Sequence, residues 1–226
     1  MAKRLFQFLA LVGVAMGHEH HGTTLFPRAE KIAPPSFGYH GITGPLNWYT
    51  LNKTSNRLCA QGTHQSPIDL GAAGCKSSQG LLSINYDNAP NGAEFINLGT
   101  TVEVFANGTL SNNGVTSNLV QFHFHSPSEH SIDGEFFPLE VHFVHQAAGE
   151  LVFLTWSFVR VLFQHLADAT LSVVGFVIEV GKTLDPLLGA VAASLKDIPS
   201  LGNTTTTKPL DFGKLEQHVA QHGIFQ

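Results

Sequence analysis

Three histidines in two short apolar segments constrain this chain more than any other feature. His123 and His125 are two residues apart, so on a β-strand their side chains lie on one face. His142 follows seventeen residues after His125, and a neighbouring strand can bring it beside the pair. Three neutral imidazoles that leave one coordination position open are a usual ligand set of catalytic zinc. The sequence therefore predicts a β-sheet that carries a Zn²⁺ site.

Polar residues accompany these histidines at a regular spacing. Gln121 and Glu140 each precede a histidine by two residues and so share its face. An oxygen there can accept a hydrogen bond from the imidazole N–H that points away from the metal, which fixes the tautomer. His130 is a candidate structural hydrogen-bond donor, and His145 is expected to face away from His142. The alternative is a set of core histidines without a metal, whose buried nitrogens would all need other partners.

The composition favours a secreted, β-rich protein of one domain. Only 13% of the 226 residues are charged, and the chain has 17 Phe and 22 Gly. The net charge is −5 and no basic run follows the N-terminus, so nucleic acid is not an expected partner. Residues 1–17 have the form of a signal peptide that is cleaved after Gly17, and their apolar stretch is too short to span a membrane.

Two further features fit the secretory route. Asn-x-Thr tripeptides begin at Asn52, Asn107 and Asn203 and are candidate glycosylation sites. Cys59 and Cys75 are the two cysteines of the chain, and in an oxidising compartment they can form a structural disulfide. They lack the Cys-x-x-Cys spacing of zinc ligands, so the histidines are better candidates for the metal.

The pattern of apolar residues predicts a mainly β (α+β) domain over residues 37–226, after a flexible segment over 18–36. Strands are expected where apolar residues alternate or β-branched residues run together, and one helix where Asp185-Pro186 supplies a cap and a first turn. The expected strands are 81–86, 100–105, 119–125, 138–145 and 171–180, and the helix is 185–198.

Residues 149–167 do not fit this pattern. They are apolar at twelve of nineteen positions, without the period of a strand or a helix. Their removal would leave a short polar connection between two strands. We favour an intron retained in frame; the alternative is a genuine insertion that forms a helix or a lid.

An ordered set of motifs resembles the α-class carbonic anhydrases, in the form found in bacteria, plants and fungi. The motifs are Phe37-Gly38-Tyr39 with Gly44-Pro45 and Trp48, His64-Gln65-Ser66-Pro67-Ile68-Asp69, Gln121-Phe122-His123-Phe124-His125 with Ser128-Glu129-His130, the segment 139–145, and Val173-Val174-Gly175-Phe176. The resemblance implies a central, largely antiparallel, twisted β-sheet with a few peripheral helices. It also implies reversible hydration of CO2 to bicarbonate and a proton by hydroxide on zinc.

The resemblance implies roles for individual residues as well. The three histidines would be the zinc ligands, and Gln121 and Glu140 would orient two of them. Glu129 would be the catalytic group that orients the hydroxide through a threonine, while Val144 and Val173 would line the CO2 pocket.

The chain departs from the family pattern in two places. Thr100 stands where fast members carry a proton-shuttling histidine, so we expect turnover that depends on buffer. The sequence ends at Gln226, before the family's Ser-Leu-Thr-Thr-Pro-Pro-Cys segment, which supplies the threonine and the usual partner of Cys59. We therefore expect an incomplete or mispredicted gene product with impaired activity, in which Cys75 is the remaining candidate partner.

Two other classes of protein are alternatives. A catalytically inactive, carbonic-anhydrase-related binding protein would share the fold, although such relatives usually lose a zinc histidine. A cupin-like metalloprotein would bind iron or manganese with His123, His125 and Glu129, but the flanking glycine spacing of a cupin motif is missing.

Overall fold

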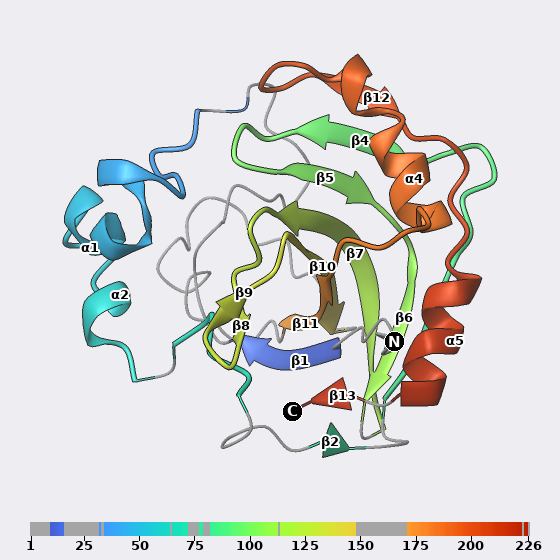
Figure 1. Ribbon diagram of the computed structural model, residues 1–226, viewed down its shortest axis with the longest axis horizontal. Coiled ribbons are helices and arrows are strands. Elements are labelled where there is room, and N and C mark those ends of the chain that lie inside the picture. The colour runs from blue at the N-terminus through green and yellow to red at the C-terminus, as the bar shows by residue number, and fades with distance from the viewer. Residues whose placement is uncertain are drawn as a thin grey trace, which may run out of the picture.

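A curled β-sheet dominates the structure, a computed structural model (Figure 1). The described residues are 10–15, 32, 34–63, 65–71, 77–78, 82–112, 114–147, 171–222 and 224–225. Within them, paired strands run antiparallel except for a single parallel bridge between the first and the last strand. The predicted mainly β, largely antiparallel architecture with a few peripheral helices is confirmed.

The elements follow one another along the chain as follows. The strands are β1 (Ala10–Ala15), β2 (Ser77–Ser78), β3 (Leu82–Tyr86), β4 (Glu94–Asn97), β5 (Val102–Phe105), β6 (Gly108–Asn112), β7 (Val115–His125), β8 (Ser131–Ile132), β9 (Glu135–Phe136), β10 (Leu139–Ala147), β11 (Leu171–Ile178), β12 (Thr204–Thr206) and β13 (Ile224–Phe225). The helices are α1 (Trp48–Leu51), α2 (Leu58–Gln61), α4 (Pro186–Ala192) and α5 (Gly213–His222), with 3₁₀ turns at Gly41–Thr43, Pro45–Asn47 and Leu195–Asp197.

The long strands β7 and β10 lie at the centre of the sheet, whose order is β12-β4-β5-β7-β10-β11-β1-β13-β2. The strand pair β3–β6 joins it through β6 and β7, and β8 and β9 form a separate hairpin. The register of β7 and β10 places His142 directly opposite His123. Burial does not alternate strictly in the second half of β7 or in β10, so side chains on both faces of these two strands are largely shielded from solvent.

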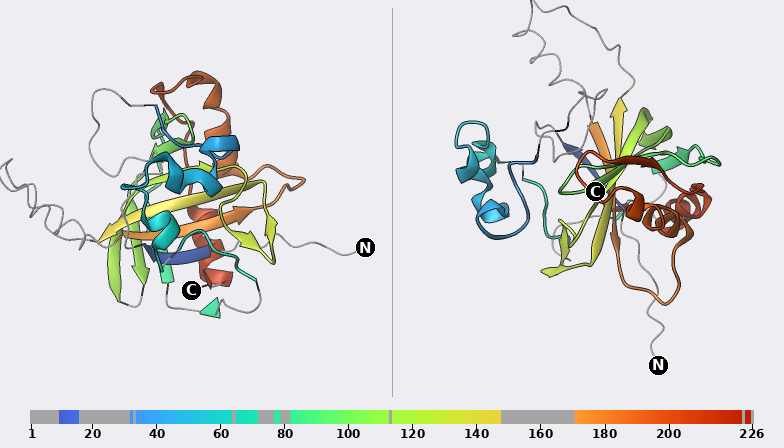
Figure 2. Two further views of the ribbon diagram at one scale, coloured as in Figure 1. Left: turned by 90° about the vertical axis from the view of Figure 1, so that its left-hand side faces the viewer. Right: turned by 90° about the horizontal axis from the view of Figure 1, so that it is seen from above.

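One face of the sheet packs an aromatic core against helices α4 and α5. Phe122 and Phe143 stack with ring centroids 4.9 Å apart, and Phe212 meets both edge to face. Val191 of α4 and Val219 of α5 belong to the same buried cluster. Figures 1 and 2 show α4 and α5 on one side of the sheet and α1 and α2 on the other. Because side chains alternate along β7, the packing of Phe122 and Phe124 turns His123 and His125 to the opposite face.

The predicted strands occur within four residues of their expected ends, but the predicted helix 185–198 is too long. The Asp185 side chain caps α4 as expected by accepting hydrogen bonds from the N–H groups of Leu187 and Leu188. The helix ends at Ala192, and the N–H of Ser194 then bonds to the carbonyl of Val191, which tightens the chain into 3₁₀ geometry. The Ser194 hydroxyl accepts from the N–H of Lys208, a tertiary contact that helical periodicity does not encode.

Part of the predicted signal peptide lies in the sheet. Residues 10–15 form β1, which pairs antiparallel with β11 so that Val12 lies opposite Val174. Cleavage after Gly17 would remove β1, which is a neighbour of β11. Gly17 and most of residues 18–36 lie outside the described residues. The cleavage and the flexible segment therefore stay predictions. Among the described residues, no helix is both long enough and apolar enough to cross a membrane.

We expect deletion of residues 149–167 to leave the fold intact and to stabilise it. Their structure lies outside the described residues, so their origin stays a prediction, but Gln146 and Leu171 on either side are paired neighbours of β10 and β11. Residues 147–170 connect the pair, and the deletion leaves five of these 24 residues, a length typical of hairpin loops. The shorter loop lowers the closure cost by about 1.4 kcal/mol. Urea unfolding measures the difference.

A nineteen-residue Gly-Ser replacement of 149–167 is the control for loop length. It should be less stable than the deletion variant by about the same 1.4 kcal/mol. If the deletion variant is less stable than the unaltered chain, residues 149–167 contribute to the fold and the prediction is wrong.

Candidate metal centre

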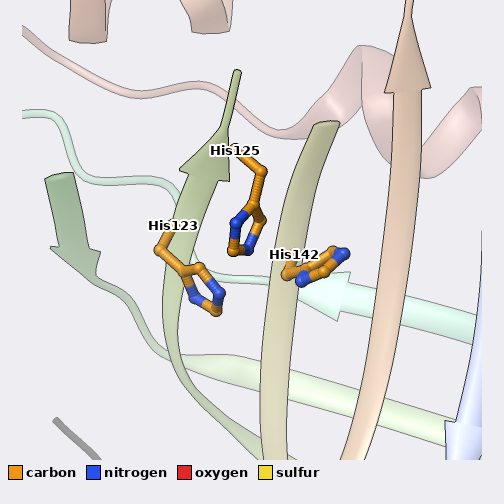
Figure 3. A group of neighbouring side chains, drawn as sticks. All are labelled: His123, His125 and His142. Carbon is orange, nitrogen blue, oxygen red and sulfur yellow. The ribbon is translucent and has the colours of Figure 1, made fainter. Parts of the chain in front are cut away.

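The structure brings the three predicted zinc ligands together on the face of the sheet opposite the aromatic core. One ring nitrogen from each of His123, His125 and His142 lies within 4.8 Å of the others. Figure 3 shows the three rings converging from two neighbouring strands, β7 and β10. His123 and His125 are each 4% exposed, and His142 is half-buried. The cluster is thus sheltered from solvent but open on the side of His142.

Hydrogen bonds at the far side of two rings match the spacing seen in the sequence. Gln121 Oε1 lies 2.9 Å from His123 Nδ1, and Glu140 Oε1 lies 2.6 Å from His142 Nε2. Each imidazole N–H donates to these oxygens, which leaves Nε2 of His123 and Nδ1 of His142 as lone-pair donors for a metal. The structure therefore places Gln121 and Glu140 where the sequence predicts them.

His125 has a different kind of partner. Its Nδ1 lies 3.1 Å from the hydroxyl oxygen of Tyr39 and 3.3 Å from Glu129 Oε1. Its Nε2 is a buried nitrogen that has no hydrogen-bond partner among the described residues. A buried nitrogen without a partner lowers the stability of the fold. A cation between the three rings would bind this nitrogen. The donor set therefore fits a zinc ion.

The carboxylate of Glu140 accepts hydrogen bonds from four N–H groups. Its Oε2 accepts from the backbone N–H groups of Glu129 and His130 at 2.8 and 2.9 Å, and its Oε1 accepts from the rings of His130 and His142 at 2.7 and 2.6 Å. Burial alone would raise the pKa of this carboxyl, but the hydrogen bonds from His130 and His142 outweigh burial and hold the pKa well below its usual range. His130 is the structural donor that its position in the sequence suggested.

His130, Glu140 and His142 form a second cluster, in which one ligand atom of each residue lies within 4.8 Å of the others. Their ligand atoms already meet at hydrogen-bond distance, 2.6 to 2.7 Å, which leaves no room for an ion between them. Gly175 lies opposite His142, and a β-carbon there would approach Glu140 Oε1 to 3.2 Å. The absence of a side chain at Gly175 thus leaves room for the hydrogen-bonded side chains of Glu140 and His142.

Val144 and Val173 lie directly opposite each other on β10 and β11. Val144 follows His142 by two residues and so shares its face, and it is buried, while Val173 is half-buried. The two side chains thus form an apolar wall beside His142. His145, by contrast, faces the core, where its Nε2 lies 2.9 Å from the Tyr86 hydroxyl and burial lowers its pKa to about 4.

The sequence did not single out Tyr39 for a role. Its hydroxyl donates to Glu129 Oε1 at 2.8 Å, whereas the family resemblance predicted a threonine as a donor to this carboxylate. Tyr39 does belong to one of the motifs on which the resemblance rests. No spacing rule, however, connects it with His125, which lies 86 residues further along the chain.

The remaining predicted sites are only partly described. Asn52, Asn107 and Asn203 are exposed, as glycosylation requires, and occupancy stays a prediction. Cys59 is exposed and forms no disulfide with another described residue, while Cys75 lies outside the described part of the chain, so their pairing stays a prediction.

A three-imidazole cluster on a curled antiparallel sheet is a donor set that can hold a metal ion, and comparisons with known proteins identify the family of the chain. Residues 43–223 match the sequence model of the eukaryotic-type carbonic anhydrases. A carbonic anhydrase of Nostoc sp. is 36% identical over 176 residues, which are 73% of this chain and 65% of that protein. One of Neisseria gonorrhoeae is 40% identical over 125 residues, 54% of this chain and 48% of that protein.

Solved structures that resemble this chain also include α-carbonic anhydrases. The fungal α-carbonic anhydrase from Aspergillus oryzae is 38% identical, with a TM-score of 0.69 over 84% of this chain and 73% of that chain. The α-carbonic anhydrase from Thermovibrio ammonificans in complex with the inhibitor sulfanilamide is 30% identical, with a TM-score of 0.58 over 79% of this chain and 70% of that chain. The chain belongs to the α-class, or eukaryotic-type, carbonic anhydrase family, as its motifs indicated. It spans about half to two thirds of the length of the curated relatives named above.

Proposed function

We propose that this chain is a zinc-dependent enzyme that reversibly hydrates CO2 to bicarbonate and a proton and, from its N-terminal sequence, that it acts outside the cell. The observation that carries the proposal is the convergence of His123, His125 and His142, each with a hydrogen-bonded partner behind its ring. Family membership supports the reaction, because the relatives that match are carbonic anhydrases.

The residues of the site have separate tasks in this reaction. When bound, zinc supplies the Lewis acidity that lowers the pKa of water to about 7 and so makes a nucleophile available at neutral pH. The three imidazoles hold the ion without cancelling its charge, and Gln121 and Glu140 keep two of the rings in the required tautomer. Val144 and Val173 offer an apolar surface beside the centre, which suits a substrate without charge or dipole.

The reaction also releases a proton, which must leave the site. Thr100, at the position where fast family members carry a histidine, has no pKa near neutrality and cannot carry it. We therefore propose that buffer in solution accepts the proton, so that turnover rises with buffer concentration.

The test is zinc content and CO2 hydration of the purified full chain. We expect about one zinc ion per chain by mass spectrometry of the metal, and hydration in stopped flow that stops after chelation and returns with zinc. Raising the buffer concentration should raise turnover, and sulfanilamide, an inhibitor bound by the Thermovibrio relative, should suppress it.

Other results would favour the alternatives. Bound zinc without CO2 hydration would favour a carbonic-anhydrase-related binding protein. Bound iron or manganese with Glu129 as a ligand would favour cupin-like chemistry. A chain that takes up no metal would contradict the proposal outright.

A further inference from the structure

The ring of Tyr39 is held in place by two aromatic neighbours, Phe37 in the segment before α1 and Trp48 at the start of α1. It meets Trp48 edge to face at 5.8 Å and Phe37 at 6.2 Å, and Trp48 in turn meets Phe37 at 5.7 Å. The indole N–H of Trp48 lies 3.0 Å from the carbonyl oxygens of Gly38 and Thr43, which ties this aromatic cluster to the local backbone. Such edge-to-face contacts restrict the ring and so aim its hydroxyl.

That hydroxyl reaches the metal centre. It lies 2.8 Å from Glu129 Oε1 and 3.1 Å from Nδ1 of His125, and the Tyr39 ring meets the His125 ring edge to face at 6.1 Å. A phenol carries one proton, so it donates to the carboxylate and accepts from the imidazole. Burial, together with the nearby Glu129 carboxylate, raises the pKa of Tyr39 far above its usual range, so the proton is present at every working pH.

The strand itself cannot supply His125 with such a partner. His123 and His142 each receive theirs from the residue two positions earlier, Gln121 or Glu140. Two positions before His125 stands His123, which is itself a candidate ligand. A partner for His125 must therefore come from another part of the chain, or from Glu129 after the strand ends.

We propose that Tyr39 is a positioning residue of the metal centre. Its hydroxyl bridges Nδ1 of His125 and the carboxylate of Glu129, and this hydrogen-bond chain keeps Nε2 of His125 deprotonated and turned toward the ion. The inference rests on the proposed function, since it assigns a role at the same zinc site. The N-terminal segment thereby becomes part of the site, although it contributes no ligand.

The variant Tyr39→Phe tests this role, because phenylalanine keeps the ring and its packing and removes one oxygen. We expect zinc affinity to fall about 10- to 100-fold, as for loss of other groups that orient a metal-bound imidazole. With Co²⁺ in place of zinc, the visible absorption spectrum should change in shape. In the metal-free chain, imidazole ¹⁵N spectra should show His125 shifting from the Nδ1–H tautomer toward a mixture of both tautomers.

Tyr86→Phe is the matched control. It also removes a phenol oxygen that contacts a histidine, at 2.9 Å from Nε2 of His145, but in the aromatic core on the other face of the sheet. It should leave zinc affinity, the Co²⁺ spectrum and the tautomer of His125 unchanged.

The outcomes separate the inference from the function. A Tyr39→Phe chain with the zinc affinity, Co²⁺ spectrum and His125 tautomer of the unaltered chain would overturn the positioning role and leave the zinc site standing. If Tyr39→Phe and Tyr86→Phe lose the same zinc affinity, the positioning role is overturned too, because a general destabilisation of the fold would then explain both losses. An unaltered chain that binds no zinc would instead overturn the proposed function.

Discussion

Replacing His142 with alanine should remove zinc binding at micromolar metal and reduce CO2 hydration to the uncatalysed rate. The variant leaves two imidazoles on β7, and two neutral nitrogen donors do not hold zinc against a chelator as three do. Loss of an orienting group behind a ligand already costs about 10- to 100-fold in affinity, so loss of the ligand should cost more than about 100-fold. Competition with a chromophoric chelator measures the affinity, and stopped flow measures hydration.

His40→Ala is the control for this variant. His40 is exposed and lies next to Tyr39 in the segment before α1, so its loss removes a histidine near the site without touching the three rings. It should bind zinc as the unaltered chain does. Zinc retained by His142→Ala with unchanged affinity would mean that the ion is bound elsewhere, and the assignment of the centre would be wrong.

The sequence predicts the centre of this fold well because the relevant rules are local. Alternation along a strand places His123 and His125 on one face and Phe122 on the other, and the structure has this arrangement. The same rule pairs Gln121 with His123 and Glu140 with His142. The pairing of the two strands, with His142 opposite His123, is tertiary and enters the prediction through the family motifs.

What the sequence misses is non-local. The end of α4 depends on Ser194 and its contact with Lys208, fourteen residues later, so helical spacing alone extends the helix too far. The contact between Tyr39 and His125 spans 86 residues and follows no period. The full role of Glu140 was underestimated for a similar reason, because two of its four donors are backbone N–H groups of the turn after β7.

Replacing Glu140 with glutamine should destabilise the chain by about 3–5 kcal/mol and weaken zinc binding about 10- to 100-fold. The carboxylate offers two oxygens to four N–H donors, whereas the amide has one oxygen and an NH2 group that points its own hydrogens at two of them. Two buried donors thus lose their acceptor although the shape of the side chain is kept. Urea unfolding of the metal-free chains and chelator competition measure the two effects separately.

The pH dependence of this difference distinguishes a charge effect from a packing effect. The pKa of Glu140 is depressed in the folded chain, so its contribution to stability is fully present above its ordinary pKa of 4.5 and is lost as the pH falls below that value. The stability gap between the unaltered chain and Glu140→Gln should therefore narrow on acidification. Glu135→Gln, at an exposed carboxyl of β9, is the control and should change the stability by no more than about 0.5 kcal/mol. If the difference in stability between the two chains stays constant down to pH values well below 4.5, the lost carboxylate acts through packing alone. If the two chains are equally stable at every pH, the four hydrogen bonds to Glu140 are not formed as described.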